Sequence, residues 1–217
     1  MMSAALELGR LEGARVRLVL TTDDALWCAR MVVGEAGEDA AASDEAAALV
    51  STMLRRYAVI NDARLARGAS ELWGSLAVLL TGTESTRGYS QPVSVYWSTR
   101  GDDARLARRA RIRSLEWSAV PLSIRQTVLD VLSGTRPLIA APAVHFAAAA
   151  VVRAQLGADA VRVPVRGASN WFTSGAESRK APEPVVRPLG SPLAGAAVLG
   201  GLCAAFALLA CCAGGVA

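Results

Sequence analysis

The stretch LWCARMVVGEAGED, which runs from Leu26 to Asp39, reads as an apolar helix that meets a glutamate and then ends. Apolar residues recur in it at helical spacing, which predicts that one face packs into a core: Leu26, Ala29, Val32, Val33 and Ala36. Thr22 can cap the helix start, with Asp23 and Asp24 in the first turn, where the helix dipole favours carboxylates. Gly37 is a suitable residue to end the helix.

Glu35 occupies the last turn of this expected helix, and Gly34 beside it has no side chain, so another segment can approach closely. A carboxyl group partly buried against Val32 and Val33 has its neutral form favoured, which raises its pKa. A general acid that works near neutral pH needs such a pKa. The alternative is a solvated or capping glutamate, which is the usual role of a single glutamate near a helix end.

Hydrophobic residues make up 53% of the 217 residues, and much of this excess lies at the C-terminal end. No charged residue follows Arg187, and the apolar run 193–217 is long enough, as a helix, to cross a hydrocarbon layer of about 30 Å. We expect this run to be a transmembrane anchor; the alternative is a hydrophobic tail buried in an assembly. The chain length suits one lobe, expected over residues 1–175, and the proline-rich stretch 176–192 is expected to be a linker.

The lobe is expected to be mostly helical with a small β element, an α+β arrangement. The helix that contains Glu35 has further elements around it, placed by apolar spacing, caps and prolines. They are a strand over 15–20, helices over 43–57, 70–80, 102–115 and 121–133, a helix or half-helix over 143–156, and extended chain over 161–174.

Composition excludes some classes of site. Of the four cysteines only Cys28 lies outside the apolar run, so the lobe has no disulfide framework. His145 is the only histidine, and we expect neither a zinc site nor another cofactor. The net charge of +4 suits a polyanion, a membrane surface or an acidic cell wall. Five arginines lie on the helix expected over 102–115, but few aromatic residues accompany them, so a solvated or anion-facing surface is favoured over nucleic-acid binding.

Four separated segments share an order with a known family. They are ARMVVGEAGED (29–39), AAALVSTMLRRY (46–57), YSQPVSVYW (89–97), and VHFA (144–147) followed by NWF (170–172). Together they resemble the spore-cortex-lytic type of cell-wall hydrolase, and particularly its phage-encoded relatives with a reduced lysozyme-like fold. The resemblance spans about residues 24–174. Gly37 stands where the family has an arginine, and the asparagine of the second segment is replaced around Arg55.

The resemblance implies a lytic transglycosylase that acts on peptidoglycan glycan strands. Such an enzyme cleaves the β-1,4 bond between N-acetylmuramic acid and N-acetylglucosamine, with Glu35 as acid and then as base. A hydrolase needs a second carboxylate at a set separation, whereas a transglycosylase uses the muramyl 6-hydroxyl instead of water. The nearest other acids are expected to solvate or cap: Glu38, Asp39 and Asp44.

The resemblance also implies which residues form the sugar-binding groove. They are Tyr89, Ser90, Gln91, Trp97, His145, Asn170 and Trp171. The loop residues among them would supply hydrogen bonds and a stacking face for N-acetyl sugars. The alternative is that Trp97 anchors a structured loop and that His145 is a packed or hydrogen-bonded loop residue.

The expected location follows from charge. Arg179, Lys180 and Arg187 precede the apolar run, which predicts that the lobe lies on the cytoplasmic side. Residues 1–20 lack the apolar core of a secretory signal, although peptidoglycan lies outside that membrane. A virion would resolve the conflict, with the protein carried to the wall by an internal membrane or tail and in contact with other virion proteins. Anchoring in the host inner membrane, with lysis after holin action, is the alternative.

Two non-enzymatic interpretations also stay open. The segment ELWGSLAVLL (71–80) faintly resembles a tryptophan–glycine groove motif of apoptosis regulators, which predicts a tail-anchored helical protein that binds partners. The other is a structural virion membrane protein with a degenerate lysozyme-like domain.

Overall fold

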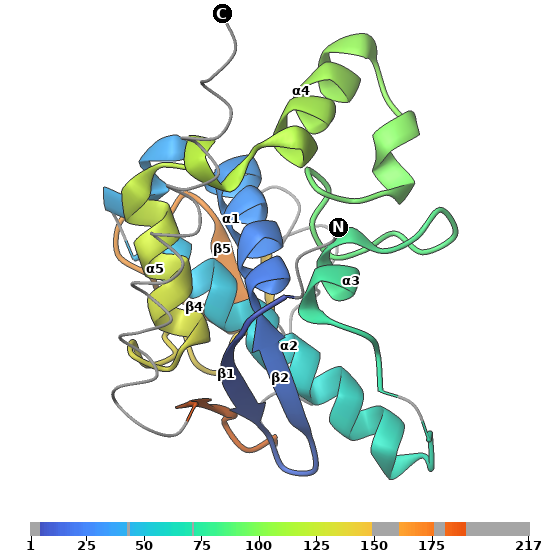
Figure 1. Cartoon of the computed structure of the whole chain (residues 1–217), viewed down its shortest axis with the longest axis vertical. Helices are drawn as coiled ribbons and strands as arrows, with labels where there is room; N and C mark the ends of the chain where they lie inside the picture. The colour runs from blue at the N-terminus through green and yellow to red at the C-terminus, as the bar shows by residue number, and fades with distance from the viewer. Residues whose placement is uncertain (1–4, 43, 71, 149–160, 176–180, 190–217) are drawn as a thin grey trace, which may run out of the picture.

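The computed structural model of the chain (Figure 1) describes residues 5–42, 44–70, 72–148, 161–175 and 181–189. These residues form five α-helices and two three-stranded antiparallel sheets, so the predicted α+β class is confirmed. Among them, no helix has both the length and the apolar character needed to cross a membrane. The apolar run 193–217, expected to be an anchor, lies outside the described residues.

Helix α1 (Thr22–Ala36) begins and ends at local signals. Thr21 caps it rather than Thr22, since the Thr21 hydroxyl accepts from the backbone N–H of Asp24 and the Asp24 carboxylate accepts from the backbone N–H of Thr21. Gly37 ends it with a φ of 85°, a conformation that glycine adopts without strain, and donates its N–H to the Val33 carbonyl at 3.1 Å. The end predicted at Gly37 is confirmed.

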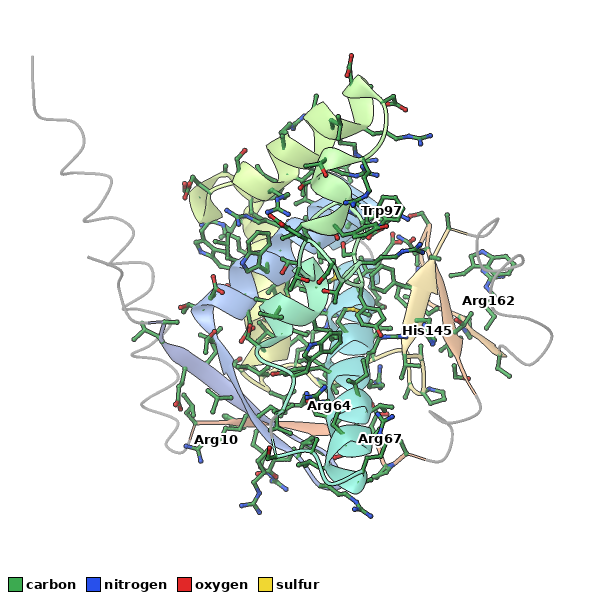
Figure 2. All side chains as sticks on the ribbon, turned by 90° about the vertical axis from the view of Figure 1, so that its right-hand side faces the viewer. Arg10, Arg64, Arg67, Trp97, His145 and Arg162 are labelled. Carbon is green, nitrogen blue, oxygen red and sulfur yellow. The ribbon has the colours of Figure 1, made fainter. Side chains whose placement is uncertain are left out.

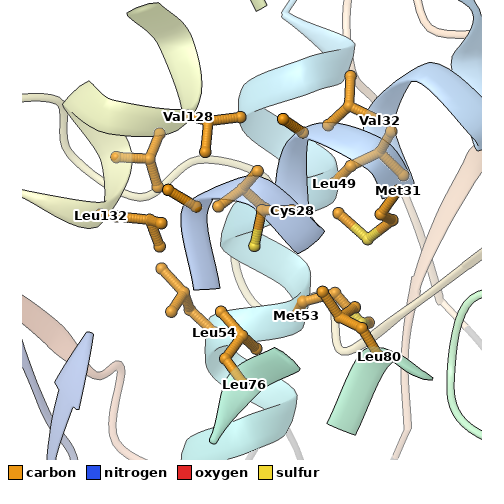
Figure 3. Close-up of a cluster of buried hydrophobic side chains, with 14 of the residues drawn as sticks. Cys28, Met31, Val32, Leu49, Met53, Leu54, Leu76, Leu80, Val128 and Leu132 are labelled. Atoms are coloured by element: carbon orange, nitrogen blue, oxygen red, sulfur yellow. The ribbon is translucent and has the colours of Figure 1, made fainter. Parts of the chain in front are cut away.

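The core lies where α1 meets three other helices (Figure 3). These are α2 (Glu45–Ala66), the short α3 (Leu76–Thr81) and α5 (Leu122–Leu132). Side chains from all four helices pack together with almost no exposure, including Cys28, Met31 and Val32, Leu49, Met53 and Leu54, Leu76 and Leu80, and Val128 and Leu132. Burial of this apolar surface is the main stabilising contribution to the lobe, and it holds the C-terminal end of α1 in place.

The region predicted as one helix over 70–80 is divided. Only α3 is helical, and side chains of α2 hold the irregular segment 72–75 before it. The Tyr57 hydroxyl donates to the Gly74 carbonyl at 2.6 Å, and the backbone N–H of Trp73 donates to Asn61 at 2.6 Å. These bonds satisfy the backbone of the tryptophan–glycine pair outside a helix. The pair therefore lies in the irregular connection between α2 and α3.

Helix α4 (Asp103–Ser114) contacts α1 and projects from the helical core (Figure 1). Its predicted existence is confirmed, and Asp102 caps it by accepting from the Arg105 backbone N–H at 2.9 Å. Only Ile112 is buried on this helix. The short 3-10 helix η2 (Tyr96–Thr99) lies against it.

The first sheet contains two strands that were not predicted from the sequence. Its order is β2 (Arg17–Thr21), β1 (Glu7–Glu12) and β6 (Val185–Pro188), and only β2 matches the predicted strand. Strand β6 lies inside the stretch 176–192 that was expected to be a linker. It pairs with β1 at the edge of the sheet. Pro184 precedes the strand and Pro188 ends it, so neither proline removes a donor that a central strand would need. The lobe therefore extends at least to Pro188.

The second sheet corrects the helix predicted over 143–156. Residues His145–Ala147 form strand β3, which pairs with β5 (Trp171–Ser174), and β5 also pairs with β4 (Val161–Val163). The buried Phe172 lies at the centre of this sheet, opposite Phe146 on one side. Packing around Phe172 outweighs the helix propensity of the alanines. The extended chain predicted over 161–174 is confirmed, while residues 149–160 lie outside the described part.

Candidate active site

The end of α1 opens onto a pocket of about 490 Å³, within the range of about 300–1,000 Å³ that is typical of small-ligand sites. Segments far apart in the sequence form its walls: the end of α1, the loop 89–92, helix α4, strand β3 and the residue before β5. The lining residues are Gly34, Glu35, Tyr89, Gln91, Pro92, Arg105, Arg108, Arg109, Phe146, Ala147, Ala148 and Asn170.

Glu35 is the one carboxylate among these lining residues. Burial raises the pKa of its carboxyl group above the usual value of 4.5. Two weaker influences lower that pKa: a hydrogen bond of 2.9 Å from the Ser90 hydroxyl to Oε1, and the positive charge of Arg108. The net effect is a carboxyl group that keeps its proton to higher pH than a solvated glutamate. It also has a donor that stabilises the charged form once the proton has left.

The loop that carries Ser90 is fixed to the end of α3. The backbone N–H groups of Tyr89 and Ser90 donate to the carbonyls of Leu79 and Leu80, at 3.1 and 3.3 Å. Ser90 itself is fully buried. These bonds to α3 position the Ser90 hydroxyl against Glu35. The contact therefore depends on tertiary structure and not on the residues next to either one in sequence.

Gly34 allows this loop to approach α1. A Cβ atom at position 34 would lie 2.9 Å from Cγ of Pro92 and closer still to its Cβ, which no real side chain tolerates. The expectation that Gly34 leaves room for another segment is confirmed, and that segment contains Pro92. The absence of a side chain at position 34 therefore brings the pocket loop next to the catalytic candidate.

A buried glutamate on α2 holds the opposite wall. Oε1 of Glu45 accepts from the backbone N–H and from Nδ2 of Asn170, at 2.8 and 2.9 Å, and from the Ser169 hydroxyl at 2.9 Å. Asn170 Nδ2 also donates to the backbone carbonyl of Glu35 at 3.2 Å. Glu45 thus ties the end of α1 to the start of β5. The sequence offered only its place in the first turn of a helix, so this role was missed.

The predicted sugar-binding residues divide into two groups. Tyr89, Gln91 and Asn170 line the pocket together with Glu35. Ser90 does not line the pocket, but its hydroxyl is hydrogen-bonded to Glu35. The other three do not line it: Trp97, His145 and Trp171.

The three residues outside the pocket lining have other contacts. Figure 2 shows Trp97 and His145 well apart from each other, Trp97 near α4 and His145 on β3. Arginine guanidinium groups lie over both tryptophan rings, with Arg109 5.7 Å from the Trp97 centroid and Arg162 4.2 Å from the Trp171 centroid. These rings are therefore engaged by the protein itself.

His145 contacts Arg56, behind the pocket wall. The Arg56 guanidinium meets both ring nitrogens of His145 and stacks 3.7 Å from the Tyr89 ring centroid. Burial, and then the charge of Arg56, lower the pKa of His145 to about 4. The imidazole is therefore neutral near pH 7. It contacts Arg56, which in turn packs on the ring of the pocket residue Tyr89.

The three arginines of the lining were predicted to form a solvated or anion-facing surface, but not to be part of this site. Arg105, Arg108 and Arg109 lie at positions i, i+3 and i+4 of α4, which share one helix face. Only the placement of α4 beside α1, a tertiary feature, reveals that this face borders Glu35.

No cluster of three or more metal-binding side chains occurs in the part of the chain that the structure describes. Comparisons with protein-family models, with curated proteins and with solved structures find no match for this chain. The chemistry of the pocket itself is therefore the basis for a functional assignment.

Proposed function

We propose that this protein is a peptidoglycan lytic transglycosylase whose catalytic acid and base is Glu35. The observation that carries the proposal is the half-buried carboxyl group of Glu35, which has a raised pKa, contacts Ser90 and borders a sugar-sized pocket. The family resemblance of the four sequence segments supports the same activity and a lysozyme-like fold.

The proposed reaction begins with proton transfer from Glu35 to the oxygen of the β-1,4 glycosidic bond. The bond between that oxygen and the anomeric carbon of N-acetylmuramic acid breaks, and N-acetylglucosamine leaves with the proton. The oxygen of the muramyl 6-hydroxyl then bonds to the anomeric carbon and gives an anhydro-sugar. Its proton returns to Glu35, which restores the acid. The Ser90 hydroxyl and the nearby Arg108 charge stabilise the glutamate anion between the two proton transfers.

The set of lining residues favours this route over hydrolysis. A hydrolase needs a second carboxylate, about 5–9.5 Å from the first, to attack or to activate water. Among the described lining residues Glu35 has no such partner. Glu45 is buried and its carboxylate already accepts hydrogen bonds from Ser169 and Asn170.

Product analysis tests the proposal. Purified peptidoglycan sacculi would be digested with the full chain in water enriched in oxygen-18, and the released muropeptides analysed by mass spectrometry. Anhydro-muropeptides without the heavy isotope are expected. Reducing-end products that carry it would identify a hydrolase, and the release of no muropeptide would remove both enzymatic interpretations.

Delivery in a virion, with residues 193–217 in a membrane, remains a prediction. Detection of the protein in purified particles, together with a clearing band in a peptidoglycan zymogram, would support it, and absence from particles would contradict it. The partner-binding interpretation has less support, because the backbone of the tryptophan–glycine pair on which it rests is hydrogen-bonded to side chains of α2, in the irregular connection before α3.

A further inference from the structure

One wall of the pocket is positively charged, and two of its three arginines form no ion pair with a carboxylate of the described residues. Arg108 donates to the Gly34 carbonyl at 2.8 Å, and Arg109 donates to the Trp97 carbonyl at 2.8 Å. Neither of them forms an ion pair with a carboxylate of the described residues. Arg105 pairs only with the exposed Asp102, at 3.2 Å. The backbone bonds orient two of the guanidinium groups and leave their charges unneutralised.

This charge lies on one part of α4 and not along the whole helix. Arg111, on the same helix, does not line the pocket and pairs with Glu38 at 3.1 Å. Arg113 donates to the Val93 carbonyl at 3.0 Å and also lies outside the lining. The described lining therefore contains three arginines of α4 and a single carboxylate, that of Glu35.

We propose that the Arg105–Arg108–Arg109 wall binds the carboxylates of the peptide stem attached to the muramyl residue, so that the enzyme selects glycan strands that carry acidic stems. The inference rests on the proposed function. A guanidinium group binds a carboxylate through two parallel hydrogen bonds, which gives both energy and orientation. The stem is attached to the same sugar whose bond Glu35 would cleave. Arg108 donates to the carbonyl of Gly34, the neighbour of Glu35, so the wall borders the place where that sugar would lie.

Nucleic acid fits this wall less well. Binding of single strands needs aromatic faces on which bases stack. The nearest tryptophan, Trp97, has Arg87 and Arg109 over its ring, each 5.7 Å from the centroid. The lining has Tyr89 and Phe146 as its aromatic members, which come from the loop 89–92 and from strand β3.

The test compares two forms of one ligand with the full chain. Glycan oligomers with native stems, and the same oligomers with every stem carboxylate converted to a methylamide, would be titrated against the Glu35→Gln variant, which binds without turnover. We expect the native oligomers to bind about tenfold more tightly at low salt, with the difference shrinking at high salt. Equal affinities would overturn the inference.

Variants locate the effect. The double variant Arg105→Gln/Arg109→Gln, in the same Glu35→Gln background, should lose most of the preference, while Arg111→Gln removes one charge from the same helix and should keep it. Equal losses in both would show a general charge effect and overturn the inference. Displacement of the oligomers by a soluble polyol phosphate, with no effect of methylamidation, would identify phosphate as the ligand and also overturn it.

The two proposals fail in different ways. If the wild-type chain releases muropeptides equally fast from native and methylamidated sacculi, the proposed function stands and the selectivity for acidic stems falls. If it releases none from either, both proposals fall.

Discussion

The Ser90 hydroxyl donates a 2.9 Å hydrogen bond to Oε1 of Glu35, across 55 positions of sequence. This bond lowers the pKa of Glu35, as does the charge of Arg108, while burial raises it by more. Burial and the two polar contacts thus shift the pKa of Glu35 in opposite directions. A single substitution can remove either polar contact.

Replacement of Ser90 by alanine should move the alkaline limb of the activity profile to higher pH. The variant loses a bond that favours the charged carboxylate, so the pKa of Glu35 rises and the group remains a proton donor further into the alkaline range. The shift should be about one pH unit, as expected for a hydrogen bond to a charged group. The measurement is muropeptide release against pH. Ser85→Ala, at an exposed position of the same loop, should leave the profile in place, and a downward shift in Ser90→Ala would contradict the argument.

Replacement of Glu35 by glutamine should stabilise the fold, and increasingly so as the pH rises. Burial raises the folded-state pKa of Glu35 above 4.5, so the wild type binds more protons when folded than when unfolded. Its relative stability is therefore full below pH 4.5 and falls as the pH rises through the raised folded-state pKa. Glutamine has no such dependence and keeps an acceptor for Ser90. Urea unfolding at several pH values measures the difference, and a gap that stays constant with pH would count against a raised pKa.

Replacement of Gly34 by alanine should strongly reduce muropeptide release while changing the free energy of unfolding only modestly. The new Cβ would meet Pro92, so the loop with Ser90 must move away from Glu35. Overpacking costs about 1–3 kcal/mol, and the better helix propensity of alanine offsets about 1 kcal/mol of this. Muropeptide release should fall about tenfold or more, because small misplacements of reacting groups are costly. Gly175→Ala is the matched control, because no described residue lies within 4 Å of the new Cβ. Equal activity in the two variants would show that the contact with Pro92 does not matter.

Replacement of Glu45 by alanine should destabilise the lobe by about 2 kcal/mol, since the buried N–H groups of Asn170 lose their acceptor. Glu45→Gln should cost less, because its side-chain oxygen can still accept from the Asn170 backbone. The measurement is the free energy of unfolding in urea. Glu84→Ala, at an exposed position, should change it by less than about 0.5 kcal/mol. If Glu45→Ala is as mild as this control, the bonds to Asn170 contribute little to stability.

Features set by neighbouring residues could be predicted from the sequence. The end of α1, with Gly34, Glu35 and Gly37, follows from helical spacing and glycine conformation. Helix α4 follows from its cap at Asp102, and helix α5 from the proline before it and the glycine after it.

Features that depend on distant pairing could not be predicted. Strand β6 forms by pairing with β1, where Arg187 lies opposite Arg10, a residue far away in the sequence. The proline-rich sequence around it does not predict a strand. Strand β3 lies in an alanine-rich segment that favours a helix, and its pairing with β5 decides its structure. The same limit applies to the site: the engagement of the Trp97 ring by arginines and the position of Arg105 in the pocket wall are tertiary facts.

The most direct measurement of the central claim is the rate at which anhydro-muropeptides are released from purified sacculi by the wild type, Glu35→Gln and Glu38→Gln. Glu38 is the matched control, because it follows α1 closely but is exposed and pairs with Arg111. We expect Glu35→Gln to lower the rate about a hundredfold or more, as the loss of a general acid and base does, and Glu38→Gln to retain it. A Glu35→Gln variant as active as the wild type, or a wild type that releases no anhydro-muropeptide, would contradict the account.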